Sequence, residues 1–398
     1  MGVRPPPRDP AAWPQLTPDD WNAVVARALA CNLAPLLFYN LRHDGRLDQV
    51  PPAARECLSA EYYASVRRHL LFEAELQPVL VALLAQGITP VLLKGIVLAE
   101  TTYPDTGLRP MADVDLLVKP ADLPGIVRVL QPLGFGGADS LAADHDFFNG
   151  ELSFAKGAHQ EMLTLEFHQD LVHSWNFTAP LALDTAGFWQ RTQPLVITDQ
   201  PVKQLALEDM LLHLCLHRAM HHGFTGLPGY VDITWSVHRW QDQIDWAALT
   251  ARARGLQAST AVFVALQLAH DLLGAAVPPA VLAALAPPAW RQRLLTRLVD
   301  LNLIMTVDVT PSQEDAGRVL NVAIIDSPRD VAQWIRLRLF PGVPWQKSNY
   351  ALDSNAAAYL YAYLLHPLRI LGGFAARAGR LLLRGKTWGH PRSYHENV

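Results

Sequence analysis

Two carboxylates separated by one residue are the clearest chemical feature of the sequence. Asp113 and Asp115 flank Val114 and lead into the apolar run Leu116-Leu117-Val118. Alternate side chains of a strand point to the same side, so both carboxylates are expected to project together from a rigid strand. Like charges held this close favour a cation between them, and Mg²⁺ prefers such oxygen ligands. The pair therefore predicts a Mg²⁺ site, although an isolated D-x-D also occurs on solvated strand edges.

Basic residues and a glycine near this pair suit the binding of phosphate. Lys94 and Gly95 lie where the apolar run of residues 88–93 gives way to a helical pattern, and Arg109 precedes the acids. Glycine allows close approach of a phosphate, a helix start offers free N–H groups, and arginine binds phosphate with two parallel hydrogen bonds. We expect all three residues to contact a nucleotide, although each taken singly could be an ordinary surface residue.

A third carboxylate lies in the segment of residues 163–168. Leu163, Leu165 and Phe167 are expected on one side of a strand, with Glu166 and His168 on the other. Glu166 is predicted to be a third metal ligand or the base toward an attacking hydroxyl, and His168 to face the cofactor. The alternative is a strand with one solvent-facing acid.

Three histidines at four-residue spacing predict one helix face. His213, His217 and His221 lack the glutamate of a metalloprotease motif, so a zinc site is weakly indicated. They are expected either to line the nucleotide or acceptor cleft, with His217 as the site candidate, or to pack as hydrogen-bonded histidines. Asp232, in an apolar context, is expected to pair with an Arg or His, or to face the cleft as a secondary site residue.

Taken together, these motifs resemble a known family. The series Lys-Gly, Tyr-Pro and R-P-M-x-D-x-D-L-L-V, with similar segments around residues 207–217 and 231–233, resembles the uncharacterised nucleotidyltransferase family of the DNA polymerase β-like superfamily. The resemblance covers roughly residues 60–330. It implies that Asp113 and Asp115 bind metal, that Glu166 is the third carboxylate, and that Lys94 and Gly95 stand in the phosphate-binding turn.

The elements that would position these residues form an α/β (α+β) architecture. Short apolar strands are expected near residues 88–93 and 114–118, with an antiparallel pair at 152–154 and 162–168, whereas the flanking sequence has helical periodicity. We predict a small mixed-sheet nucleotidyltransferase core flanked by N-terminal and C-terminal helical regions. The predicted divisions are a Pro-rich segment 1–16, a helical region 17–86, the core 87–200, a helical domain 201–300 and a C-terminal helical extension 301–398.

Composition limits the partners. The net charge of −4 gives no global basic footprint, so DNA is not an expected partner. Three widely separated cysteines and the lack of an apolar leader favour a reduced, cytoplasmic protein. The apolar stretch 356–371, followed by the basic stretch 377–386, could rest on a membrane, but such a stretch is more often a docked C-terminal helix, so membrane contact is not expected.

The predicted function is that of a Mg²⁺-dependent nucleotidyltransferase. It would transfer a nucleoside monophosphate from a nucleoside triphosphate, with ATP the expected donor, to the hydroxyl of an acceptor that is a small molecule, a peptide or protein, or an RNA end. Two alternatives remain open at this stage. One is a catalytically inactive nucleotide- or partner-binding module of the same fold, and the other is a toxin-like nucleotidyltransferase acting on RNA or protein. The sequence has no Gly-x-Ser-x-Gly elbow and no P-loop.

Overall fold

The computed structural model of the protein describes residues 16–136, 151–157, 162–171, 185–305, 320, 322–340 and 355–373. The predicted Pro-rich segment, apart from its last residue, lies outside these described residues, as does the basic stretch 377–386.

A six-stranded mixed sheet forms the centre of the fold. Its spatial order is β3-β4-β2-β1-β6-β5. The central strand β2 pairs in parallel with β4 and antiparallel with β1, and β1 in turn pairs in parallel with β6. The predicted α/β class with a mixed sheet is confirmed. The strands are β1 Val91–Leu92, β2 Asp113–Leu117, β3 Glu151–Lys156, β4 Leu163–His168, β5 Gln193–Ile197 and β6 Gln200–Gln204.

The alternating pattern of β4 explains why this segment is a strand. Leu163, Leu165 and Phe167 are almost completely buried, while Glu166 between them is only partly buried. The predicted antiparallel pairing of the segments near 152–154 and 162–168 is confirmed as the β3–β4 ladder. Because β2 has Val114 and Leu116 fully buried, the face with the acids is opposite a packed apolar face.

The β5–β6 hairpin extends the sheet beyond the predicted core boundary at residue 200, and the sequence did not predict it. Its strands carry Pro194 and Pro201, which count against a strand assignment unless the strand lies at an edge. β5 is such an edge strand, because it pairs with β6 alone in the sheet order. The turn places Thr198 and Asp199 at φ 48° and 60°, a left-handed conformation that is uncommon without glycine.

Three N-terminal helices precede the sheet. Thr17 and Asp20 form a reciprocal capping box at the start of the first helix. The third helix ends just before Gly87, whose φ of 75° suits the end of a helix. These helices are α1 Pro18–Ala30, α2 Ala34–His43 and α3 Pro52–Ala85.

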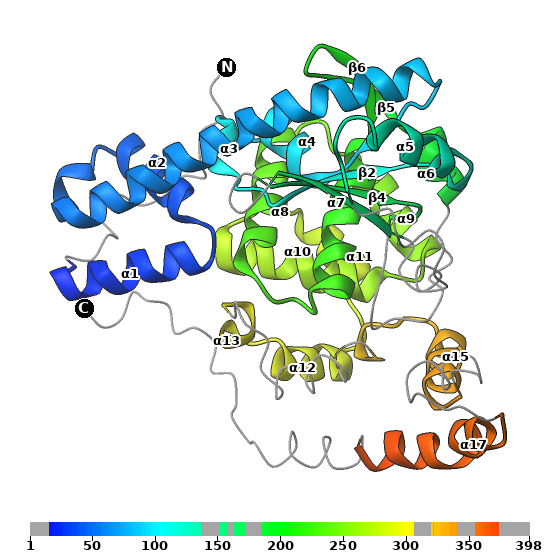
Figure 1. Ribbon diagram of the computed structural model, residues 1–398. Helices are drawn as coiled ribbons and strands as arrows, with labels where there is room; N and C mark the ends of the chain where they lie inside the picture. The colour runs from blue at the N-terminus through cyan, green and yellow to red at the C-terminus, as the bar shows by residue number, and fades with distance from the viewer. Residues whose placement is uncertain are drawn as a thin grey trace.

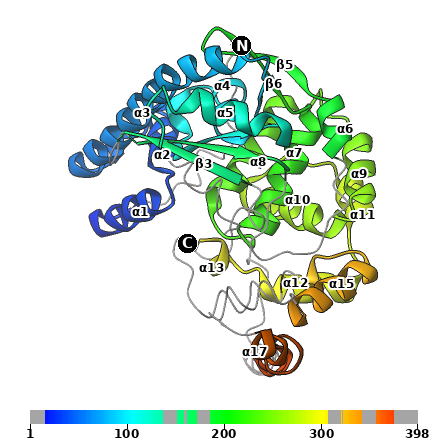
Figure 2. The ribbon, with the colours of Figure 1, turned by 45° about the vertical axis from the view of Figure 1, so that its right-hand side comes forward.

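Helices cover both faces of the sheet. α3 and α5 lie on one side, and α7, α8 and α10 lie on the other (Figures 1 and 2). One hydrophobic cluster runs from Leu36 to Ile324, so the sheet and these helices share a core. The remaining helices are α4 Lys94–Thr101, α5 Leu123–Leu130, α6 Thr185–Gln190, α7 Leu207–Leu216, α8 Leu227–Trp240, α9 Trp246–Gly255, α10 Ser259–Leu273, α11 Pro279–Leu285, α12 Ala289–Leu298, α13 Leu301–Ile304, α15 Pro328–Leu339 and α17 Asn355–Leu360. Within the described part of the chain, none has the length and apolar character needed to cross a bilayer.

A buried carboxylate anchors α7 against its neighbours. Asp209 has no exposed side-chain surface and accepts hydrogen bonds from two arginines. Arg191, just after α6, donates from Nε at 2.7 Å, and Arg252 of α9 donates from a terminal nitrogen at 2.9 Å. A buried carboxylate is tolerated only when such partners compensate its lost hydration. This contact therefore sets where α7 lies relative to the sheet.

Asp209→Ala is expected to lower the free energy of unfolding by about 3 kcal/mol or more, because it leaves two guanidinium groups facing an empty, partly buried position. Denaturant titration followed by circular dichroism measures this change. Asp242→Asn, at an exposed aspartate after α8, is the matched control and should unfold like the wild type. Equal midpoints for Asp209→Ala and the control would contradict the anchoring role.

Candidate functional site

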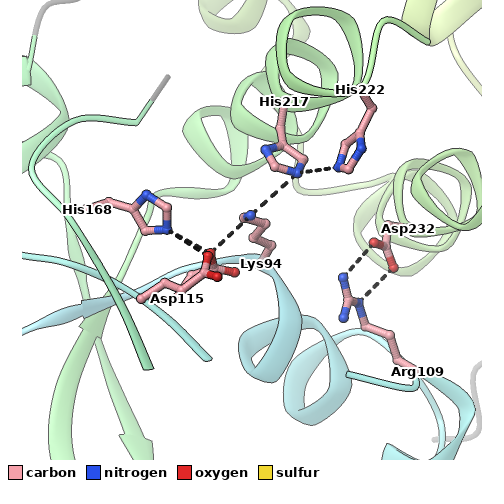
Figure 3. A network of polar contacts seen from close by, with 8 residues as sticks. Lys94, Arg109, Asp115, His168, His217, His222 and Asp232 are labelled. Carbon is pink, nitrogen blue, oxygen red and sulfur yellow. Dashed lines mark hydrogen bonds and ion pairs between the residues drawn. The ribbon is translucent and has the colours of Figure 1, made fainter. Parts of the chain in front are cut away.

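The carboxylate of Asp115 is the centre of the site. It lies in the middle of β2 and is 2% exposed. Lys94 places Nζ 3.1 Å from Oδ1, and Nε2 of His168 lies 2.8 Å from the same oxygen (Figure 3). Burial by itself would raise the pKa of Asp115, but Lys94 and His168 hold it far below its ordinary value. The carboxylate is therefore ionised while surrounded by protein.

The parallel pairing of β2 and β4 brings a second carboxylate beside the first. Asp115 lies opposite Glu166 in the register, so both side chains project from the same face of the sheet. His168, two residues further along β4, reaches both, with Nε2 3.8 Å from Oε2 of Glu166. One ligand atom from each of these three residues lies within 4.8 Å of the others. Two carboxylates and an imidazole form a donor set that suits a divalent cation.

Asp113 stands at the start of β2 on the face that carries Asp115. It is partly buried and is not a member of the compact group formed by Asp115, Glu166 and His168. Burial and the neighbouring charge of Asp115 raise the pKa of Asp113 above its ordinary value. This is the electrostatic penalty expected when two carboxylates share a site, and a bound cation would relieve it.

Lys94 and Gly95 begin α4, directly after β1. No side chain caps this helix terminus, which leaves the amides of its first turn available to a ligand. Gly95 is buried, and a Cβ there would lie 3.3 Å from Sδ of Met111 and 3.4 Å from the guanidinium of Arg109. The glycine therefore permits the segment before β2 to pack closely against the start of α4.

Arg109 and Asp232 form a bidentate pair away from the Asp115 carboxylate. Nε and a terminal nitrogen of Arg109 each donate to one oxygen of Asp232 at 3.0 Å (Figure 3). The hydroxyl of Tyr103 donates to the same carboxylate at 2.7 Å. The expected pairing of Asp232 with an arginine is confirmed. Asp232 is 5% exposed, and a buried carboxylate requires a compensating partner such as Arg109. The guanidinium of Arg109, which we expected to face phosphate, is therefore directed at Asp232.

The histidine segment is not a regular α-helix. After α7 the chain forms a π-helix over His217–His221, and the amide of His222 donates to the carbonyl of His217. The rings of His217 and His221 stack with centroids 4.7 Å apart, and Nε2 of His222 lies 2.9 Å from Nε2 of His217. A uniform four-residue periodicity could not predict the His217–His222 contact. The sequence feature that could have indicated this contact is the adjacent pair His221-His222. π-Helical turns are frequent at functional sites.

His217 connects this segment to the site. Its Nε2 lies 3.4 Å from Nζ of Lys94, so Lys94 stands between a carboxylate and an imidazole (Figure 3). His213, one turn earlier, is almost completely buried. Burial and the charge of Lys94 lower the pKa of His213 to about 3, and burial and Arg218 lower that of His222 to about 2. These two histidines are therefore neutral at pH 7.

Comparison with known families agrees with this geometry. The family model described as "uncharacterised nucleotidyltransferase" matches residues 17–274. The chain belongs to this family. The matched range contains all six strands and every site residue named above. No curated protein and no solved structure matches the chain. Membership supports general nucleotidyl transfer, and the carboxylates of β2 and β4 are candidate metal ligands.

The free energy of unfolding is expected to fall as the pH is lowered from 7 to 5. The pKa of His213 is about 3 in the folded chain and about 6.5 in an unfolded one, so the unfolded state binds the additional proton in this range. His213→Leu should reduce the dependence of the free energy of unfolding on pH by up to about 1.4 kcal/mol per pH unit. Denaturant titrations at several pH values measure this dependence.

His43→Leu, which removes an imidazole from the exposed end of α2, is the control for that experiment. Parallel stability curves for His213→Leu and the wild type would contradict a neutral, buried His213.

Proposed function

We propose that the chain is a Mg²⁺-dependent enzyme that transfers a nucleoside monophosphate from a nucleoside triphosphate to an acceptor hydroxyl. The observation that carries this proposal is the pairing of Asp115 with Glu166 on adjacent parallel strands, with Lys94 at the same carboxylate. Phosphoryl-type transfers depend chiefly on positioning and on neutralising charge, so few residues are needed. These three residues provide both kinds of charge on one rigid face.

The residues fit a hard divalent cation. Asp113, Asp115 and Glu166 offer oxygen ligands on one face of the sheet, which is the donor type that Mg²⁺ prefers. Nε2 of His168 donates to the carboxylate of Asp115, and this hydrogen bond would orient Asp115 for the cation. When bound, Mg²⁺ supplies charge stabilisation to the attacking and leaving oxygens of an in-line displacement.

The start of α4 is the proposed triphosphate site. Lys94 neutralises Asp115 in the described structure, and a cation held by the carboxylates would take over that role. The Lys94 side chain is 14% exposed, and its ammonium would then be available to the phosphates beside the uncapped amides of α4. We therefore keep Lys94 and Gly95 as proposed phosphate contacts. We propose that Arg109 and Asp232 instead hold the segment before β2 against α8.

Glu166 is the proposed base in the transfer. Its carboxylate is partly exposed, with 24% of the side-chain surface accessible, so an acceptor can reach it. The acceptor hydroxyl gives its proton to Glu166 as its oxygen bonds to the α-phosphorus. The bond from that phosphorus to the bridging oxygen breaks, and pyrophosphate leaves with the electron pair.

The stacked rings of His217 and His221, with the neighbouring His222, are proposed to line the nucleotide or acceptor side of the site. They reach it through the contact between His217 and Lys94. Planar rings can stack on a base or a sugar, and each ring also offers a nitrogen for a hydrogen bond. The expected donor is ATP. The overall charge of −4 favours a small or protein acceptor over long nucleic acid.

The double variant Asp113→Asn/Asp115→Asn is expected to lose Mg²⁺-dependent binding of nucleoside triphosphates. Isothermal titration calorimetry with each of the four ribonucleoside triphosphates measures binding, with and without Mg²⁺. Asp242→Asn removes an exposed carboxylate and should bind as the wild type does. A well-folded wild type that binds no triphosphate, or a double variant that binds with unchanged affinity, would refute the proposed site.

Lys94→Met is expected to weaken triphosphate binding by about tenfold or more, since a charge-assisted phosphate contact is worth roughly 1.5–3 kcal/mol. The loss should shrink when a nucleoside monophosphate replaces the triphosphate, because fewer phosphates reach the start of α4. Lys119→Met, which removes an exposed lysine after β2, is the control. Equal losses for triphosphate and monophosphate would indicate that Lys94 acts only on Asp115.

A further inference from the structure

A row of large apolar side chains is exposed on the helical run 355–373, which comprises α17, the π-helix Tyr361–Leu365 and residues 366–373. They are between 42% and 64% exposed, which is unusual for so many neighbouring leucines and tyrosines. The seven residues are Tyr359, Leu360, Tyr363, Leu364, Leu365, Leu368 and Leu371. We call them the apolar helix face.

The opposite side of the same helix is already docked. Ala362 and His366 are buried there, and Nε2 of His366 lies 2.9 Å from the carbonyl of Arg338 at the end of α15. One residue of the apolar helix face, Tyr363, also approaches this region: its ring centroid lies 6.2 Å from that of Phe340, just after α15, while Tyr363 stays 64% exposed. Figures 1 and 2 show α15 and α17 together at the end of the molecule away from the sheet. Docking therefore uses one side of the helix and leaves the apolar helix face outward.

Charge is distributed unevenly between this end and the rest of the chain. Residues 328–398 contain ten Arg and Lys against three Asp and Glu, whereas residues 1–327 contain 23 against 34. Residues 328–398 are therefore positively charged, although the net charge of the whole chain is −4. On the described residues the positive groups include Arg336 and Arg338 of α15 and Arg369 beside the apolar helix face.

We propose that the apolar helix face binds the surface of an anionic lipid bilayer, with the helix lying in the plane of the interface. Leucines enter the boundary between headgroups and acyl chains, tyrosines sit at the headgroup level, and nearby arginines attract anionic headgroups. The sequence favoured a docked helix over membrane contact. The structure shows the docked helix, and docking occupies the side with Ala362 and His366, which leaves the exposed leucines and tyrosines for the proposed contact.

A bilayer suits this surface better than the other candidate partners. A second copy of the chain would bring two positively charged ends together, and their repulsion opposes such a dimer. A nucleic acid would contact a basic groove, whereas the exposed surface here is formed by leucines and tyrosines. The inference does not depend on the proposed nucleotidyl transfer, since the helix contributes no residue to that site.

Vesicle flotation of the full chain tests the proposal. Binding is expected to vesicles of phosphatidylcholine mixed with phosphatidylglycerol, to be weaker for phosphatidylcholine alone, and to decrease at high salt. Leu364→Glu/Leu368→Glu should lower the bound fraction about tenfold or more, because it places two charges in the apolar helix face. The matched control Leu70→Glu/Val81→Glu changes two similarly exposed residues of α3 and should float like the wild type.

Leu364→Ser/Leu368→Ser is a milder variant that keeps the test decisive if the glutamate variant does not fold, and it should also bind less. Size-exclusion chromatography with light scattering measures the oligomeric state of the same samples. The proposal is overturned if the wild type does not float with anionic vesicles, or if both leucine variants float as well as the control. It is also overturned if the wild type is a dimer that these variants convert to a monomer, or if it binds RNA but no vesicle.

Discussion

The buried carboxylate of Asp115 is the constraint on which the rest of the site depends. An ionised group with 2% exposure is tolerated only beside compensating partners, and two different elements provide them: Lys94 contributes a positive charge and His168 a hydrogen bond. Satisfying this one carboxylate therefore fixes the start of α4 and the end of β4 relative to β2. The arrangement also holds the ammonium of Lys94 at the carboxylate face of the sheet, where we propose that the nucleotide binds.

Two further buried carboxylates extend this arrangement to the helices. Asp232 on α8 binds Arg109 and Tyr103 from the segment before β2. Asp209 on α7 binds Arg191, just after α6, and Arg252 on α9. Each of these contacts joins a helix on one face of the sheet to a segment elsewhere in the fold. The histidine-bearing π-helix lies between α7 and α8. Ion pairs on the helices before and after it, α7 and α8, therefore help to hold the π-helix near Asp115, together with its own contacts.

The sequence was sufficient for the features that depend on local pattern. Alternation around Leu165 and Glu166 predicted the strand and its polar face, and the series from Lys94 to Asp115 predicted the family. Features that depend on tertiary burial could not be obtained in this way. The sequence could not show that Arg109 pairs with Asp232, because Asp232 lies on a distant helix. Two prolines obscured the β5–β6 hairpin: Pro194 is tolerated because β5 is an edge strand, and Pro201 because it precedes the two residues of β6 that pair with β1. The His217–His222 contact required a change of helix type that periodicity does not encode.

The parallel pairing of β2 with β4 also has a consequence for biosynthesis. Asp115 and Glu166 are neighbours in space but belong to strands separated by a helix and another strand in the chain. The ribosome therefore synthesises Lys94, Asp113 and Asp115 well before β4. The pairing of β2 with β4 must close a long loop, and pairing between distant segments is slow in folding. A nascent chain that ends before residue 163 holds two of the proposed metal ligands but no assembled site. The proposed metal site can therefore be complete only after translation has supplied β4.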